Sequence, residues 1–187
     1  AADKIYDKTA PTGDGAIGMI VREPVGVVAA ILPWNFPLMM LAWKIGPALA
    51  AGDTVILKPA EWTPLSASFF ADLTIEAGIP KGVFNVVFGL GEEAGTALTK
   101  HPGVSRISFT GSVPTAKKIA KVAADNLTPV SFELGGKSPV IVDKSVNIKK
   151  AVQSIAWGKF SNNGQTCIAP DYLYVHESVK VIQHCIN

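Results

Sequence analysis

The chain has 187 residues, of which 48% are hydrophobic and 17% charged, a composition typical of a globular protein with one domain or one domain plus part of another. Its formal net charge of +2, with scattered lysines, argues against nucleic-acid binding. No apolar run reaches the roughly 18 residues of a membrane span, and no signal-peptide core is present. Two cysteines, Cys167 and Cys185, make no disulfide framework, so a reducing, cytoplasmic compartment is expected. The three histidines stand apart, and no metal site is expected.

The first 22 residues are polar and contain several glycines, and they end in an alternating stretch from Ala16 to Val21. Alternation of this kind is typical of strands, so residues 1–22 are expected to form an extended arm or a hairpin.

From residue 23 onward, apolar runs typical of buried strands alternate with stretches typical of helices. The expected strands cover residues 25–32, 54–59, 83–87, 106–109 and 130–134, and the expected helices cover residues 38–51, 64–77, 92–101 and 115–125. This alternation predicts an α/β fold with an open, parallel, Rossmann-like sheet and helices on both faces. Ligands of such sheets bind beyond the carboxyl ends of the strands.

The pattern changes after Gly136, where we expect a domain boundary. Residues 23–136 would form a dinucleotide-binding domain, and residues 137–187 the incomplete start of a second α/β domain. That second stretch offers strands at 139–142 and 172–175 and a helix at 148–160. About 50 residues are too few for a separate core.

Cys167 ends a turn-forming stretch, Ser161-Asn162-Asn163-Gly164-Gln165-Thr166-Cys167, directly after the expected helix. Small polar neighbours leave a sulfur reachable, and the N–H groups of a turn favour the thiolate, which is the reactive form. The stretch fits a nucleophile, and a half-buried structural cysteine is the alternative.

Two further side chains suit the chemistry of such a nucleophile. Asn35 is fixed between aromatic residues and prolines, which suits an N–H donor to a developing oxyanion; the alternative is a cap on the following helix. Glu133 lies at the end of an apolar strand, where desolvation would favour a general base; the alternative is a carboxylate neutralised by Lys137.

Three stretches suit a nucleotide cofactor. Gly111-Ser112 joins a strand to a helix N-terminus that can hold a pyrophosphate, although an ordinary serine cap has the same residues. Lys58 and Glu61 can hold ribose hydroxyls, with the carboxylate disfavouring a 2′-phosphate, or can be a solvated surface pair. The glycines between residues 89 and 95 lack the spacing of a dinucleotide fingerprint and predict a turn followed by a helix.

Five motifs together resemble those of the aldehyde dehydrogenase superfamily and follow in that family's order. They are Pro33-Trp34-Asn35-Phe36-Pro37, Lys58-Pro59-Ala60-Glu61, Phe109-Thr110-Gly111-Ser112, Glu133-Leu134-Gly135-Gly136-Lys137-Ser138-Pro139 and Asn162-Asn163-Gly164-Gln165-Thr166-Cys167. The resemblance covers nearly the whole chain. Family members are far longer, so the chain resembles a fragment with most of the cofactor domain and the start of the catalytic domain. Its first half resembles the aminoaldehyde branch and its C-terminal part the fatty-aldehyde branch, which leaves the aldehyde open.

The resemblance implies an NAD(P)-dependent oxidoreductase that converts an aldehyde to a carboxylic acid. Cys167 would form a thiohemiacetal and then a thioester, Asn35 would donate to the oxyanion, and Glu133 would activate the hydrolytic water. NAD is the expected cofactor, with NADP as the alternative, and the parent enzyme is expected to be a homo-oligomer. The residues expected to contact the cofactor are Ile31, Pro33, Trp34, Lys58, Glu61, Gly91, Phe109, Gly111, Ser112 and Leu134.

Two other functions fit the residues. The chain could be a nucleotide-binding module without catalysis, or an interaction fragment without a ligand. The isolated chain is expected to be unstable or inactive, because an incomplete second domain leaves apolar surface uncovered.

Overall fold

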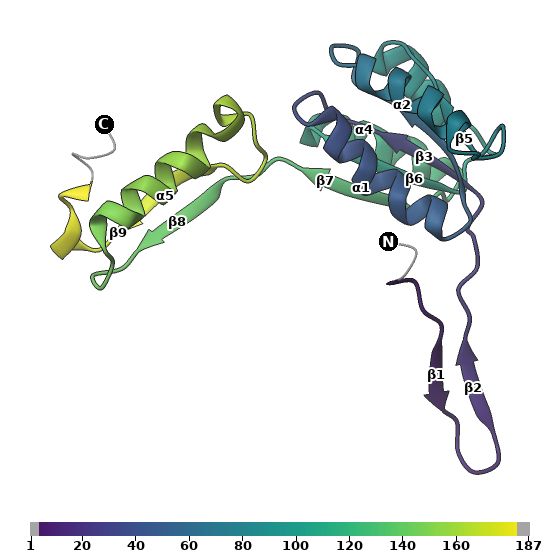
Figure 1. The fold of residues 1–187 in the computed structure, drawn as a ribbon, viewed down its shortest axis with the longest axis horizontal. Helices are drawn as coiled ribbons and strands as arrows, with labels where there is room; N and C mark the ends of the chain where they lie inside the picture. Colours follow the sequence, from purple (N-terminus) through teal and green to yellow (C-terminus); the bar gives the residue numbers. More distant parts are fainter. Residues whose placement is uncertain (1–3, 183–187) are drawn as a thin grey trace. The chain divides into compact units, whose positions relative to one another are not determined.

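The chain divides into two compact units, Ala1–Glu133 and Leu134–Asn187. The structure, a computed structural model, describes residues 4–182 (Figure 1). Each unit has its own sheet and its own buried residues, so each is described by itself.

The larger unit is built on a five-stranded parallel sheet with the strand order β5-β4-β3-β6-β7. The central strand pairs on both sides: Ile31 lies opposite Lys58 in one neighbour and opposite Phe109 in the other. Both faces of this strand are covered, which explains why it is apolar throughout. The predicted α/β fold is therefore confirmed. The strands are β3 (Val27–Ile31), β4 (Thr54–Lys58), β5 (Phe84–Val86), β6 (Arg106–Gly111) and β7 (Val130–Leu134).

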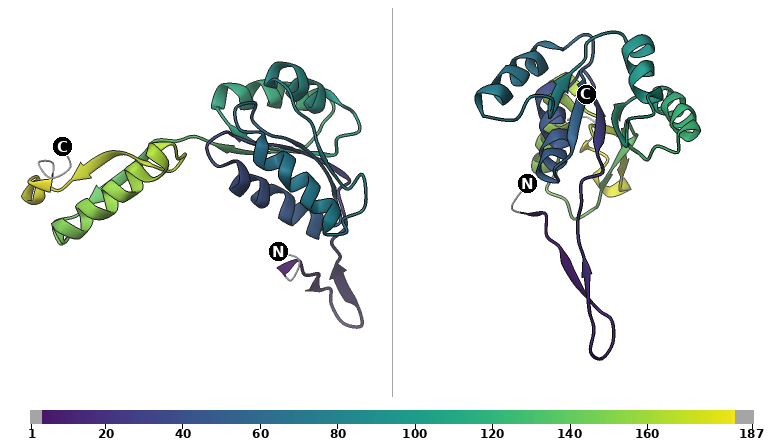
Figure 2. Two further views of the ribbon diagram at one scale, coloured as in Figure 1. Left: turned by 45° about the horizontal axis from the view of Figure 1, so that its top comes forward. Right: turned by 90° about the vertical axis from the view of Figure 1, so that its right-hand side faces the viewer.

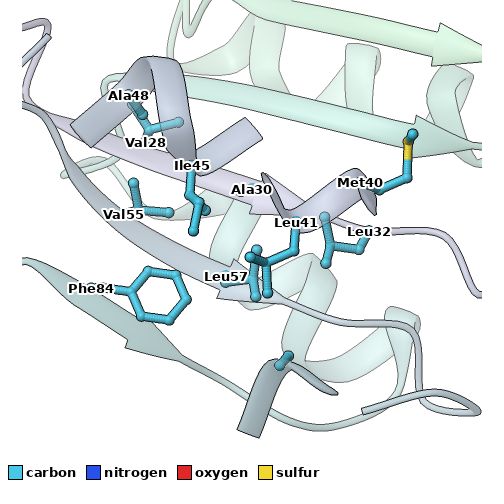
Figure 3. Packing of buried hydrophobic residues seen from close by; sticks show 11 residues of the cluster. Val28, Ala30, Leu32, Met40, Leu41, Ile45, Ala48, Val55, Leu57 and Phe84 are labelled. Atoms are coloured by element: carbon cyan, nitrogen blue, oxygen red, sulfur yellow. The ribbon is translucent and has the colours of Figure 1, made fainter. Parts of the chain in front are cut away.

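Helices cover both faces of this sheet. The first two, α1 (Pro37–Ala50) and α2 (Leu65–Glu76), lie on one face, and α3 (Thr96–Lys100) and α4 (Val113–Asp125) on the other (Figure 2). A π-helical turn, η2 (Gly91–Gly95), leads into α3, so the predicted helix at 92–101 is present but irregular. Under α1 and α2, a core forms from Val28, Ala30, Leu32, Met40, Leu41, Ile45, Ala48, Val55, Leu57, Ala67 and Phe84 (Figure 3).

The junction between β6 and α4 differs from the sequence expectation. The strand runs on to Gly111, and the helix begins at Val113 instead of residue 115. The helix starts earlier because Ser112 accepts a hydrogen bond from the Thr115 N–H (3.3 Å), and a proline in the first turn needs no N–H partner. No loop therefore separates the sheet edge from the helix N-terminus.

The N-terminal residues form a hairpin of β1 (Lys8–Pro11) and β2 (Ile17–Ile20), paired antiparallel. Arg22 holds its base: its N–H donates to an Asp7 carboxylate oxygen (2.8 Å) and its Nε to the Tyr6 carbonyl (3.0 Å). Ile17 is 85% exposed, so the apolar residues of the hairpin are not covered by the described residues.

The smaller unit is a parallel strand pair, β8 (Ser138–Val142) and β9 (Pro170–Val175), joined through α5 (Ile148–Phe160). Short 3₁₀ turns follow α5 and β9: η3 (Ser161–Gly164) and η4 (Glu177–Val179). The expectation that this stretch cannot form a core is wrong. A small core forms because α5 and the residues after β9 cover the same strands; its buried members are Val142, Ile155, Val179 and Ile182.

Within residues 4–182, no helix is both long and apolar enough to cross a membrane. The same residues contain no group of three or more His, Cys, Asp or Glu side chains that could hold a metal ion.

Candidate active site

Three parallel strands of the larger unit are followed by, or end in, polar or aromatic residues at the carboxyl end of the sheet. Trp34 and Asn35 follow β3, Lys58 ends β4, and Ser112 follows β6. Because β3 pairs in register with both neighbours, these chain segments leave the sheet side by side. The strand register thus brings together residues that are up to 78 positions apart in the sequence.

Lys58 is buried, with only 3% of its surface exposed, and its ammonium donates to the Pro59 carbonyl (3.1 Å). The nearest Glu61 carboxylate oxygen lies 3.6 Å from its Nζ, on a side chain that is 44% exposed. A Cβ on Gly95 of η2 would lie 3.6 Å from the lysine Cδ, so the π-helical turn packs against the aliphatic stem. Lys58 is therefore a buried lysine that its neighbours fix in place. The alternative of a solvated surface pair does not fit it.

Gly111 is required by its neighbour Phe109. A Cβ at residue 111 would lie 2.6 Å from the tip of the Phe109 ring, which leaves no room for a side chain. That ring is 4% exposed and packs edge-on against Phe132, with 6.1 Å between the ring centres. Ser112, which follows, is exposed and caps α4, so the alternative of a serine cap holds here. A capped helix N-terminus still presents N–H groups to an anion.

Asn35 lies directly before Phe36, the N-cap residue of α1, which makes no side-chain cap hydrogen bond. Asn35 is partly buried, beside a Trp34 that is 43% exposed. Trp34 lies against Trp62, with 6.2 Å between the ring centres and a tilt of 49°.

The remaining residues that we expect to contact the cofactor differ in how far they are buried. Ile31 is buried at the end of β3, and Pro33 is partly buried just after it. Gly91 is exposed at the start of η2. Leu134, the last residue of β7, is partly buried and is the first residue of the smaller unit.

Lys44 is a polar residue of this region that the sequence analysis missed. Its ammonium donates to the Ser108 hydroxyl across the α1–β6 contact (3.0 Å). Burial lowers the pKa of Lys44 from 10.5 to about 8, against the attraction of the Glu133 carboxylate, which raises it. The sequence did contain a sign that Lys44 is unusual, because it is the only charged residue of the apolar helix α1.

Glu133 is exposed, which corrects the expected desolvation of its carboxylate. It lies on β7, the strand at one end of the sheet order, and its side chain is exposed there. Lys137, its expected neutralising partner, instead pairs with Asp171 within the smaller unit (3.1 Å). The charge that Glu133 does act on is that of Lys44.

Cys167 is exposed and is a free thiol in the smaller unit. The loop before it folds on itself: the Gln165 N–H donates to the Asn162 carbonyl (3.0 Å), and the Thr166 hydroxyl to the Ser161 carbonyl (3.5 Å). This exposure removes the alternative of a half-buried structural cysteine.

Comparison with known proteins agrees with this arrangement of motifs. Residues 1–185 match the model of the aldehyde dehydrogenase family. The chain belongs to that family. An aminoacetaldehyde dehydrogenase of Pseudomonas aeruginosa is 53% identical over 180 residues, which are 95% of this chain and 36% of that protein. The NADP/NAD-dependent aldehyde dehydrogenase PuuC of Escherichia coli is 52% identical over 96% of this chain and 37% of its own length.

Solved aldehyde dehydrogenases have the same fold. A putative aldehyde dehydrogenase from Burkholderia cenocepacia superposes with a TM-score of 0.94 at 42% identity, over 99% of this chain and 39% of that one. The NAD⁺ complex of the Bacillus cereus enzyme also gives 0.94 at 42% identity, over 99% and 38%. The chain thus spans little more than a third of the length of these relatives.

Proposed function

We propose that this chain provides most of the cofactor domain, and the nucleophile, of an NAD(P)-dependent enzyme that oxidises an aldehyde to a carboxylic acid. The observation that carries the proposal is the exposed, free thiol of Cys167 at the end of the family's Asn-x-Gly-Gln-x-Cys stretch. Membership of the aldehyde dehydrogenase family supports the reaction class.

The residues at the sheet edge fit a dinucleotide by the chemistry of their donors and acceptors. The N–H groups at the start of α4 and the buried ammonium of Lys58 suit phosphate and ribose oxygens, and the Glu61 carboxylate suits ribose hydroxyls as donors. Gly91 adds a place where backbone can approach a ligand, since nothing lies within 4 Å of a Cβ built there. The bound nicotinamide would accept a hydride from the substrate.

The protein groups carry the other steps. The Cys167 thiolate attacks the aldehyde carbon, forming a C–S bond, and the oxyanion accepts a hydrogen bond from the Asn35 amide. Loss of hydride turns this adduct into a thioester. Glu133 takes a proton from water, which attacks the thioester carbon; the C–S bond breaks, and the acid and the thiolate are released.

The test uses the full-length enzyme that contains this chain, with Cys167→Ala and, as the matched control, Cys185→Ala. Reduced nicotinamide is followed by absorbance with a panel of aliphatic and aromatic aldehydes. We expect Cys167→Ala to abolish turnover and Cys185→Ala to retain it, while hydrolysis in ¹⁸O-water labels the acid. Turnover that survives Cys167→Ala would overturn the proposal.

Cofactor choice follows from Glu61. Its carboxylate would repel the 2′-phosphate of NADP, so NAD is the preferred cofactor. Calorimetry on the full-length enzyme is expected to show weaker binding of NADP than of NAD. Glu61→Gln should reduce the ratio of the NADP dissociation constant to the NAD dissociation constant about tenfold, because it removes the negative charge and keeps the side chain's size. Equal affinities in the unaltered enzyme would contradict this assignment.

We further propose a homo-oligomer in a reducing compartment such as the cytoplasm. A catalytic thiol must remain reduced, which supports the compartment. The oligomer is supported by the hairpin β1–β2, whose apolar residues are exposed and which pairs with no other strand among residues 4–182.

A second candidate, for the 187-residue chain by itself, is nucleotide binding without catalysis. The exposure of both Glu133 and Cys167 favours it, because catalysis by a thiolate and a base needs walls that exclude water. Titration of the chain with NAD separates this candidate from a fragment without any ligand.

A further inference from the structure

The loop before Cys167 has an unusual backbone. Asn162, Asn163 and Gly164 follow one another with φ angles of 50°, 55° and 76°, all in the left-handed region. Among residues 4–182, the non-glycine residues with positive φ are Leu127, Asn162 and Asn163. Two of these three therefore lie within five positions of the cysteine.

The left-handed residues lie where the chain reverses direction. Helix α5 ends at Phe160, and β9 must begin at Pro170 beside Ser138 of β8. The left-handed turn makes the reversal in three residues. It is closed from Gln165 N–H to the Asn162 carbonyl (3.0 Å) and from the Asn162 amide to the Gln165 carbonyl (3.4 Å).

The turn is constrained at its end as well as at its start. A Cβ on Gly164 would lie 3.2 Å from the Lys159 carbonyl, so the chain passes too close to α5 for a larger residue. After it, the Ala169 N–H donates to the Thr166 carbonyl (3.1 Å), which fixes the two ends of the segment containing Cys167.

Side-chain burial does not account for the left-handed conformation of the two asparagines, since both are exposed. The left-handed region is unfavourable for residues with a Cβ and least so for asparagine. Backbone strain that persists on a loop is expected where the conformation serves a task.

We infer that Asn162 and Asn163 are positioning residues, whose left-handed backbone fixes the place of the Cys167 thiolate relative to the substrate. This rests on the proposed role of Cys167 as the nucleophile. Asn163 is the residue to test, because glycine keeps its conformation accessible and valine, branched at Cβ, disfavours it. The identity of its side chain then matters only through the backbone.

The experiment measures kcat and KM for NAD in the full-length enzyme with Asn163→Gly and Asn163→Val. We expect Asn163→Gly to keep kcat within about twofold of the unaltered value. Asn163→Val should lower kcat about tenfold, because valine makes the left-handed conformation at residue 163 less favourable than glycine does. KM for NAD should stay unchanged, because the expected cofactor residues Lys58, Glu61 and Ser112 lie in the larger unit.

Leu127→Val is the matched control, because Leu127 also has a positive φ (52°) but lies in the larger unit. It should lower the unfolding temperature and leave kcat unchanged. Equal kcat values for Asn163→Gly and Asn163→Val would overturn the inference, as would an equal loss in Leu127→Val. Activity that survives Cys167→Ala would instead mean that the proposed function itself has failed.

A second readout needs no turnover. The rate at which iodoacetamide alkylates Cys167 in the full-length enzyme, followed by peptide mass spectrometry to separate it from Cys185, should differ about fivefold or more between Asn163→Val and the unaltered enzyme, and should be preserved in Asn163→Gly. Identical alkylation rates in all three chains would also overturn the inference.

Discussion

Lys44 is the only charged residue of α1, and its ammonium lies between that helix and β6. At neutral pH the burial of this charge lowers the free energy of unfolding. Burial lowers its pKa to about 8, whereas an unfolded chain would have 10.5. Below pH 8, both states bind the proton, and the folded state bears the full penalty. Between pH 8 and 10.5, the folded state releases a proton that the unfolded state keeps, so this group's contribution to stability improves as the pH rises.

Replacing this lysine tests that sign. Lys44→Met should raise the free energy of unfolding at pH 7 by about 1 kcal/mol, a discounted value because the site is partly open to solvent. The gain should shrink as the pH approaches 10. Urea unfolding at both pH values measures it, with the exposed Lys121→Met as control. A gain that is the same at both pH values would show that desolvation of Lys44 is not the cause.

At the scale of elements, the junction between β6 and α4 depends on Gly111. Gly111→Ala would force the Phe109 ring from its position, because the new Cβ would lie 2.6 Å from it. Loss of the edge contact with Phe132 should then lower the free energy of unfolding by about 1–3 kcal/mol.

A glycine with space around it provides the control. Nothing lies within 4 Å of a Cβ built on Gly46 of α1, so Gly46→Ala should stabilise by about 0.5–1 kcal/mol through helix propensity. Denaturant titration compares the two variants, and destabilisation of equal size in both would refute the Phe109 explanation.

The hairpin β1–β2 is the element that we expect to cross to another subunit. Charged residues at two exposed apolar positions, Ile17→Lys and Met19→Lys together, should lower the mass of the full-length enzyme in light scattering. Leu127→Lys, at another exposed apolar residue, should leave the mass unchanged. A monomeric unaltered enzyme would count decisively against this role of the hairpin.

At the scale of the whole molecule, much apolar surface remains uncovered on both units. In the smaller unit, α5 and β9 expose Trp157 (77%), Phe160 (67%) and Tyr174 (61%), and Ile141 of β8 is 79% exposed. Surface of this kind favours association or aggregation. We therefore expect the 187-residue chain by itself to aggregate or to require a partner.

The same exposure leads to a prediction about catalysis. Purified and mixed with NAD and an aldehyde panel, the 187-residue chain should show no sustained reduction of cofactor, because the Cys167 thiol is exposed. Absorbance is followed beside the Cys167→Ala chain. Sustained turnover that this variant abolishes would prove that residues 1–187 already contain a working site.

The sequence alone determined the order of strands and helices and the family. Apolar runs and helical periodicity are local properties, so β7 and α5 begin and end where the pattern predicted, and most other boundaries fall within two residues. The family motifs are likewise contiguous stretches that can be recognised without a fold, which is why the expected site residues could be named in advance.

Only the tertiary structure decided what surrounds each of those residues. Lys58 is buried because η2 packs on its stem, and Glu133 is exposed because β7 is an edge strand; both depend on chain segments distant in the sequence. The same holds for Lys44, whose partner Ser108 is 64 positions away, and for the Phe109 ring beside Gly111, which packs against Phe132 of another strand. Burial and pairing are set by long-range packing, and a local pattern records only which residues are available for it.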